Sequence, residues 1–376
     1  MSKDQSATGS GLRGQSAGVT SICTVGKTGS GLTYRGFDLS DLAKNATFEE
    51  VAYLLIYDKI ATSEELLAYK NKLKGLRTLP DPLKVVLEQF PKTAHPMDVI
   101  RSGCSALGIL EPEENFSQQY DKTDRMLAIF PSIVNYWYHY SNNGKRIETE
   151  TDDDTVGSHF LSLLHGRKPT ELEEKVMNVS LILYAEHEFN ASTFSARLTA
   201  STLSDIFSAV TAAIGTLRGP LHGGANEAAL DMILQWKSKE EAEAGILKIL
   251  ETKDLVMGFG HAVYKEFDPR NPIIKEYSKE LSQSHPESYL YDVSERVEMV
   301  MKREKGLFAN ADFYHASAYR FMNIPIELFT PIFVCSRVTG WTAHIFEQRA
   351  NNKLIRPSAD YNGPEPREWV SLESRG

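Results

Sequence analysis

The stretch SARLTASTLSDIFSAVTAAIGTLRG, residues 195–219, shows most clearly which class of fold the chain adopts. Its large apolar side chains recur at helical spacing, at Leu203, Ile206, Val210, Ile214 and Leu217. Side chains three or four positions apart share one face of a helix. Most other positions are Ala, Ser or Gly, which let neighbouring helices approach the backbone closely. We therefore predict a central, buried helix, which Gly219-Pro220 ends.

Helical periodicity continues on both sides of this stretch. In ELEEKVMNVSLILYAE, residues 171–186, the apolar side chains again lie on one face. The charge-rich residues 235–305 contain two amphipathic surface helices, which is consistent with a smaller domain set between two parts of a larger one. Alternation typical of strands is nearly confined to residues 19–37. The pattern predicts an all-α, mainly helical protein with a short N-terminal hairpin.

The composition excludes several classes of protein. The chain has 376 residues, of which 41% are hydrophobic, and a formal net charge of −9, which disfavours binding to nucleic acid or to acidic membranes. Its three cysteines are far apart and form no CxxC pair, as in proteins with reduced thiols. The N-terminus lacks the apolar core of a signal peptide, and no apolar run reaches membrane-spanning length. We expect a cytoplasmic protein.

The segment CTVGKTGSG, residues 23–31, partly matches a phosphate-binding P-loop. A P-loop needs a glycine five positions before its GK[ST], and here Ser21 stands there. The loop should also open a helix, but Gly29, Ser30 and Gly31 are poor helix formers. We predict a glycine-rich hairpin turn with an exposed lysine. The alternative, a nucleotide-binding protein, requires binding or hydrolysis of ATP or GTP, and we expect neither.

Histidines raise the question of a metal site. HEFNA at His187 begins like a zinc-protease motif, but Ala191 stands where the HExxH pattern needs its second histidine. His159 and His165 are six positions apart, which is too far for the usual spacing of two ligands on one helix face. We expect no metal site.

Three short stretches place a reactive side chain among small residues. They are RGPLHGGANE around His222, MGFGHAVYKEFDPR around His261 and NADFYHASAY around Asp312. Taken singly, each has a structural explanation, because a histidine or aspartate in such a turn often only caps it. Together, one carboxylate and two imidazoles suit proton abstraction next to a carbonyl, since an imidazole can stabilise the enolate that forms.

Four stretches resemble the signatures of the citrate synthase family, in the family's order and over nearly the whole chain. They are LYAEHEFNASTFSAR, GPLHGGANE, GFGHAVYKEFDPR and FTPIFVCSRVTGWTAHIFEQRANNKLIRPSADYNGP. The resemblance implies a helical homodimer with a large domain of residues 1–222 and 323–376. A small domain of residues 223–322 would close over the substrates. No cofactor is bound tightly in this family, and a coenzyme A thioester is a substrate.

The resemblance also implies a role for each reactive side chain. Asp312 would take an α-proton from an acyl-CoA thioester, and His222 would donate to the thioester oxygen. His261 would protonate the keto group of oxaloacetate as the new carbon–carbon bond forms, after which water hydrolyses the thioester. An inactive relative that only binds a partner is a further alternative, but the presence of all three side chains argues against it.

Substrate binding is likewise implied by the resemblance. Oxaloacetate would be held by His187, Arg270 and Arg337, with Arg356 supplied by the partner subunit. Guanidinium groups suit carboxylates, whereas the alternative for these arginines is surface ion pairing. The residues implied for coenzyme A are Leu255, Val256, Met257, Gly258 and Phe259 for the adenine, and Lys265 and Lys305 for the phosphates. For these lysines the alternative is a solvated surface.

The acyl group is the remaining question, because a hydrophobic pocket discriminates one methylene by only about 1–3 kcal/mol. Residues 17–43, 93–108 and 137–166 resemble the branch of the family that makes 2-methylcitrate from propionyl-CoA, and CTVGK is part of that resemblance. Phe313-Tyr314-His315 departs from the tryptophan-containing version of some members of this branch. We expect propionyl-CoA to be preferred and acetyl-CoA to react more slowly. The alternative is a citrate synthase that uses acetyl-CoA.

Overall fold

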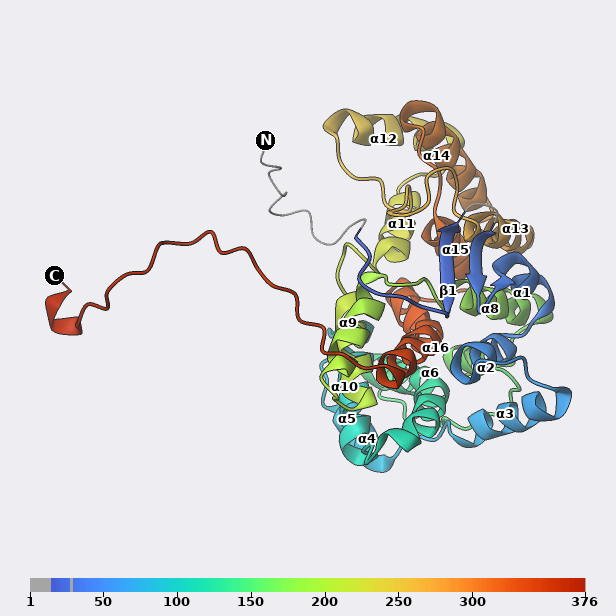
Figure 1. Cartoon of the computed structure of the whole chain (residues 1–376). Helices are drawn as coiled ribbons and strands as arrows, with labels where there is room; N and C mark the ends of the chain where they lie inside the picture. The colour runs from blue at the N-terminus through green and yellow to red at the C-terminus, as the bar shows by residue number, and fades with distance from the viewer. Residues whose placement is uncertain (1–14, 28–29, 376) are drawn as a thin grey trace.

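The computed structural model describes residues 15–27 and 30–375 (Figure 1). The first half of the chain forms α1 (Leu39–Asn45), α2 (Phe48–Tyr57), α3 (Ser63–Gly75), α4 (Asp81–Glu88), α5 (Pro96–Leu110), η1 (Phe116–Gln118), α6 (Gln119–Asn143), α7 (Val156–His165) and α8 (Glu171–Tyr184). The second half forms α9 (Ala191–Ser201), α10 (Ile206–Leu217), α11 (Ala225–Ile233), α12 (Lys239–Thr252), α13 (Arg270–Ser282), α14 (Tyr289–Lys305), α15 (Ala311–Phe321), η2 (Ile326–Leu328), α16 (Phe329–Ala350) and η3 (Leu372–Ser374). The predicted mainly helical class is confirmed.

The described strands form one small antiparallel sheet near the N-terminus, in the order β1 (Cys23–Lys27), β2 (Ser30–Tyr34) and β3 (Phe37–Asp38). β1 pairs with β2 in a hairpin register, so the predicted hairpin is confirmed. Thr28 and Gly29, at the predicted turn, lie outside the described residues. Because the GKT segment leads into strand β2 and not into a helix, it lacks the geometry of a P-loop.

Local sequence signals explain where several helices begin. α2, α3 and α8 are each preceded by a threonine whose hydroxyl accepts the backbone N–H of a glutamate three residues later, and the carboxylate of that glutamate accepts the threonine backbone N–H. In α8 the apolar face expected from the sequence is buried, since Val176, Val179 and Leu183 are at most 1% exposed. The periodicity therefore identified this helix and its buried face correctly.

The predicted single helix over residues 195–219 is wrong in one respect. The segment is divided between α9 and α10, and Leu203 lies in the connection with a left-handed backbone (φ 67°) and 60% of its surface exposed. Asp205 begins α10 because its carboxylate accepts the backbone N–H of Ser208. The remaining apolar residues of the pattern, Ile206 to Leu217, are buried as expected.

The most deeply buried helix is α16, which runs through the middle of the molecule (Figure 1). Every residue from Phe329 to Phe346 is buried, so this helix is enclosed on all sides. Its neighbours include α6, α8, α9 and α10. A side chain on α16 can therefore contact several segments that are distant in sequence.

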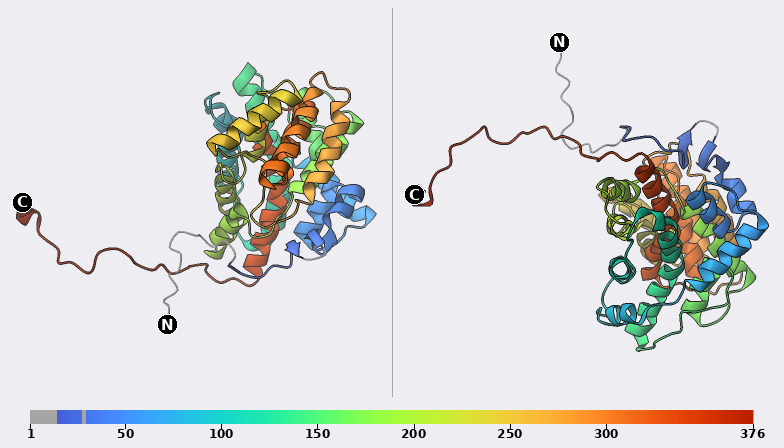
Figure 2. Two further views of the ribbon diagram at one scale, coloured as in Figure 1. Left: turned by 90° about the horizontal axis from the view of Figure 1, so that it is seen from above. Right: turned by 60° about the horizontal axis from the view of Figure 1, so that its bottom comes forward.

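Helices α11 to α15 gather at one end of the molecule, where α12 packs on α14 and α13 packs on α15 (Figure 1). α12 and α14 coincide with the two amphipathic helices expected from the charge-rich segment. Asn352 and Ile355 still bond to Ser201 at the end of α9, and residues 356–375 then extend away from the helical body (Figure 2). No helix among residues 15–27 and 30–375 is both long and apolar enough to cross a membrane.

Candidate active site

His261 and Asp312 lie on two segments that are held side by side. Phe259 and Ala309 form an isolated antiparallel bridge. Two backbone hydrogen bonds extend it, from Gly260 N–H to Phe308 C=O (2.8 Å) and from Asn310 N–H to Gly258 C=O (2.9 Å). The loop that carries His261 is therefore fixed against the start of α15.

Asp312 occupies the first turn of α15, where Asn310 caps the helix. Its Oδ1 accepts a hydrogen bond from the Tyr184 hydroxyl (2.7 Å). Burial raises the pKa of Asp312, an effect that the Tyr184 bond and the charge of Arg270 partly oppose. The carboxyl group is thus a stronger base than an exposed aspartate, while it stays partly accessible.

His261 is held in one tautomer by its own loop. Its Nδ1 accepts the backbone N–H groups of Val263 (3.0 Å) and Tyr264 (3.2 Å). The proton of the neutral ring must therefore be on Nε2. Burial, with the charge of Arg270, lowers the pKa of His261 to about 4. The group is then a neutral imidazole that offers an Nε2–H donor.

His222 lies just before α11 and is held through Nε2, whereas His261 is held through Nδ1. The backbone N–H of Ser192 donates to His222 Nε2 (3.3 Å), and the Ser192 hydroxyl lies 2.9 Å from the same atom. Trp341 on α16 donates to that hydroxyl (3.0 Å). Burial and the charge of Arg337 lower the pKa of His222 to about 4. The neutral ring therefore carries its proton on Nδ1 and can donate from there.

Two buried arginines give the site a positive character. Arg337 is 1% exposed and donates from Nε to the backbone carbonyl of Tyr184 (2.6 Å), and its guanidinium lies 4.6 Å from the centre of the Phe333 ring. Arg270 is 6% exposed and is paired with the carboxylate of Asp268 through two bonds of 2.9 and 2.7 Å. Because buried cations attract anions strongly, this arrangement suits a small dicarboxylate.

His187 completes the cluster. It is 7% exposed, its ring centre lies 5.0 Å from that of His261, and its Nε2 is buried without a hydrogen-bond partner in the described structure. Burial lowers the pKa of His187, and the charges of Arg270 and Arg337 act in the same direction. The structure thus brings together six residues expected from the sequence: His187, His222, His261, Arg270, Asp312 and Arg337.

The other expected residues lie outside this cluster. Arg356 is exposed on the extended C-terminal segment. Lys265 and Lys305 are exposed, the latter at the end of α14. Of the segment Leu255–Phe259, Leu255 is 82% exposed, whereas its other end joins the bridge to Ala309.

Three residues that the sequence did not single out support the cluster. Asp268 pairs with Arg270 and also accepts the backbone N–H of Ala311 (3.0 Å), which links that arginine to α15. Tyr184 contacts Asp312, and Ser192 contacts His222. Asp268 could have been noticed, because it stands two residues before Arg270 in the same motif. The other two had no comparable local signal.

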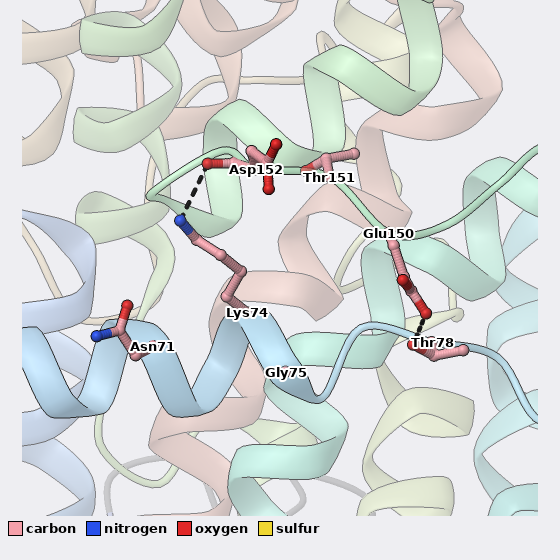
Figure 3. Close-up of a pocket in the computed structure, with 7 residues that line it drawn as sticks. All are labelled: Asn71, Lys74, Gly75, Thr78, Glu150, Thr151 and Asp152. Atoms are coloured by element: carbon pink, nitrogen blue, oxygen red, sulfur yellow. Dashed lines mark hydrogen bonds between the residues drawn. The ribbon is translucent and has the colours of Figure 1, made fainter.

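A hollow of about 550 Å³ lies elsewhere, between α3 and residues 150–152 (Figure 3). Lys74 and Thr78 line it and bond to Asp152 (3.0 Å) and Glu150 (2.7 Å). None of the candidate site residues borders it, so it is not the site described above. Among the described residues, no group of three or more His, Cys, Asp or Glu side chains could hold a metal ion.

Comparison with known proteins places this geometry in a family. The family model described as "Citrate synthase, C-terminal domain" matches residues 11–358. A 2-methylcitrate synthase of Shewanella oneidensis is 61% identical, with both chains covered in full. Citrate synthase 2 of Bacillus subtilis is 42% identical over 97% of this chain and 98% of its own. The structure of citrate synthase from Thermoplasma acidophilum with carboxymethyl coenzyme A and oxaloacetate superimposes with a TM-score of 0.91, at 33% identity, over 97% of this chain and 98% of the other. The chain belongs to the citrate synthase family.

Proposed function

We propose that the chain is a 2-methylcitrate synthase, which condenses propionyl-CoA with oxaloacetate and hydrolyses the product thioester to 2-methylcitrate and coenzyme A. The observation that carries the proposal is the full-length identity of 61% to a relative of that name. Acetyl-CoA would be a slower substrate. The second candidate, a citrate synthase, is favoured only by relatives of lower identity, such as the one at 42%.

In the first step, Asp312 removes a proton from the carbon next to the thioester carbonyl. Its pKa, raised by burial, makes the carboxylate a better base for this task. His222 donates a hydrogen bond from Nδ1 to the thioester oxygen, which stabilises the enolate as it forms. A neutral histidine suits this role, because the Ser192 N–H donates to Nε2 and the ring proton is therefore on Nδ1.

In the second step, the enolate carbon attacks the keto carbon of oxaloacetate. His261 gives its Nε2 proton to the keto oxygen, which becomes the hydroxyl group of the product, and the proton that Asp312 took then restores the ring, so both groups regain their starting states. His187, Arg270 and Arg337 hold the two carboxylates of oxaloacetate, and Arg356 of the partner subunit adds a further cation. Water then attacks the thioester carbonyl, and coenzyme A leaves as the thiol. The overall balance consumes one water molecule.

The remaining expectations complete the proposal. The enzyme would act as a homodimer in the cytoplasm, in propionate catabolism, with no tightly bound cofactor and with neither nucleic acid nor membrane as a partner. The buried free thiols Cys23, Cys104 and Cys335 are compatible with a reducing compartment. The large domain would comprise residues 1–222 and 323–376, and the small domain residues 223–322. Coenzyme A would contact Leu255–Phe259, Lys265 and Lys305.

Product identification tests the proposal. The purified protein is incubated with oxaloacetate and propionyl-CoA, and both the released thiol and the acid product are measured. We expect thiol and 2-methylcitrate in equal amounts, and no thiol release when oxaloacetate is omitted. Thiol release without a condensation product would show a thioesterase and overturn the proposal. Hydrolysis of ATP or GTP would instead support the nucleotide-binding alternative.

A further inference from the structure

The segment that carries His187, residues 185–190 between α8 and α9, has an unusual backbone. Glu188 adopts a left-handed conformation with φ of 54°, although it is not a glycine. Such a conformation is costly for a residue with a side chain and persists only where surrounding contacts impose it. The contacts that hold the segment therefore determine where the His187 ring lies.

One anchor is the carboxylate of Glu186, which is fully buried. Its Oε1 accepts the backbone N–H of Glu188 (2.6 Å), so the carboxylate closes a turn around His187. The same oxygen lies 2.8 Å from Nε2 of His344 on α16. The Arg197 guanidinium on α9 donates to the other ring nitrogen, Nδ1 (3.0 Å). Because arginine only donates, the His344 proton must be on Nε2, where it bonds Glu186.

A second anchor lies on the other side of His187. The Phe189 ring has the Arg197 guanidinium 4.6 Å from its centre and contacts the His344 ring edge to face at 5.6 Å. His344 thus contacts both Glu186 and Phe189, and Arg197 contacts His344 and Phe189. We call these two side chains, Arg197 and His344, the clamp.

The clamp lies on well-packed supports. His344 is fully buried on α16, and Arg197 is 6% exposed and also pairs with Glu347 (2.7 Å). The α16 backbone approaches the His187 segment so closely that a Cβ on Gly340 would lie 2.2 Å from Glu186 Oε2. The position of the segment is therefore set by α16 and α9, with little freedom to shift.

We infer that Arg197 and His344 are positioning residues for oxaloacetate. They contact no substrate, but they fix the loop that presents His187 beside His261 and the two buried arginines. The inference rests on the proposed function, because it takes His187 as an oxaloacetate ligand. Displacing a binding group by a small distance is costly, whereas the residues proposed to contact acyl-CoA, His222 and residues 255–259, lie outside residues 185–190.

The test compares three single variants by calorimetric binding of oxaloacetate and by steady-state kinetics. His344→Phe removes the donor to Glu186, and we expect the Kd for oxaloacetate to rise by about 10–100-fold, with the KM for acyl-CoA changed by less than about threefold. His344→Gln retains an N–H at similar reach, and we expect it to restore the Kd to within about threefold of the wild type. Arg197→Gln replaces the other member of the clamp. We expect it to raise the Kd for oxaloacetate as His344→Phe does.

His159→Phe is the matched control. His159 is also fully buried and bonded on both nitrogens, to Ser132 (3.1 Å) and Thr151 (3.0 Å), but it stands on α7, faces α6 and has no hydrogen bond or ring contact with the His187 segment. It should lower the melting temperature without changing the Kd for oxaloacetate. If the folded variants His344→Phe and Arg197→Gln bind oxaloacetate with the Kd of the wild type, the clamp has no positioning role. If the wild type itself does not bind oxaloacetate, the proposed function is refuted as well.

Discussion

His222 and His261 are neutral at physiological pH for the same physical reason. Each is half-buried beside a cation that cannot lose its charge, Arg337 for one and Arg270 for the other, so protonation would place two positive charges together. A neutral imidazole donates a hydrogen bond without adding charge to the site. The buried arginines therefore contribute to the proposed chemistry indirectly, in addition to their proposed role as ligands of a dicarboxylate.

Replacing the proposed base tests its role directly. Asp312→Asn keeps the size of the side chain and an oxygen that can accept the Tyr184 hydrogen bond. We expect kcat to fall by about 10²–10⁴-fold, because the amide cannot take a proton. The Kd for oxaloacetate, measured by calorimetry, should stay within about threefold of the wild type. A variant with more than about a tenth of the wild-type kcat would contradict the assignment.

The lowered pKa of His222 also predicts how stability depends on pH. Its pKa is about 4 in the folded protein and 6.5 when unperturbed, so as pH falls below 6.5 the unfolded chain binds a proton first. The free energy of unfolding therefore decreases between these two values. At about pH 5 the loss from this one histidine is on the order of 2 kcal/mol.

Urea unfolding of the wild type and of His222→Gln measures this effect. Between about pH 7 and about pH 5, the variant should lose on the order of 2 kcal/mol less of its unfolding free energy than the wild type, because glutamine does not titrate. An equal loss in both proteins would show that His222 is not kept neutral by the fold.

At the scale of single elements, periodicity predicted helices well and their ends poorly. The apolar face of α8 follows directly from spacing, because Val176, Val179 and Leu183 recur at helical intervals and are all buried. The continuous helix over residues 195–219 was wrong because Leu203 fits the period but Asp205 caps a new helix two residues later. The capping aspartate begins a new helix although the apolar spacing continues across the break. Apolar spacing alone does not reveal such a cap.

Gly258 lies in the pair of bridged segments that joins His261 to Asp312, whereas Gly306 ends α14. We predict that replacing these two glycines by alanine has different effects on stability and on kcat. Gly258 has φ of 86°, and a Cβ there would lie 3.0 Å from side-chain atoms of Phe313. Gly306 is left-handed too, with φ of 65°, but has open space around it. Gly306→Ala should cost about 1–2 kcal/mol from the backbone conformation alone.

Gly258→Ala should cost about 1–3 kcal/mol more than Gly306→Ala, because Phe313 must move. Since Phe313 adjoins Asp312, we expect kcat to fall in Gly258→Ala and to be unchanged in Gly306→Ala. Thermal unfolding and kinetics on the two variants give the comparison. Equal costs and equal kcat values would mean that the close packing at Gly258 has no influence on the proposed base.

At the scale of the whole molecule, the residues that cluster in the candidate site could be singled out from the sequence because each lies in a short motif with its own composition. Of the three supports, Asp268 shares a motif with Arg270, but the contacts of Tyr184 and Ser192 could not be predicted. Tyr184 meets Asp312 across 128 residues of chain, and Ser192 meets His222 and Trp341 only after α9, α11 and α16 have packed. Such contacts depend on the tertiary arrangement, of which one sequence gives no direct sign.

Mixing two inactive variants tests whether Arg356 acts across a dimer. Asp312→Asn and Arg356→Ala are each purified, then mixed, exchanged and assayed. If Arg356 serves the partner's site, a mixed dimer contains one site with both changes and one with neither. Random exchange should then restore about a quarter of the wild-type activity. If Arg356 serves its own subunit, every site keeps one change and the mixture stays inactive.

The central claim is that this chain joins a propionyl group to oxaloacetate. The most direct measurement is kcat/KM for propionyl-CoA and for acetyl-CoA, determined side by side with saturating oxaloacetate. We predict that propionyl-CoA has the higher value, by about tenfold or more, as one methylene in an apolar pocket allows. A higher kcat/KM for acetyl-CoA would contradict the claim and identify the chain as a citrate synthase.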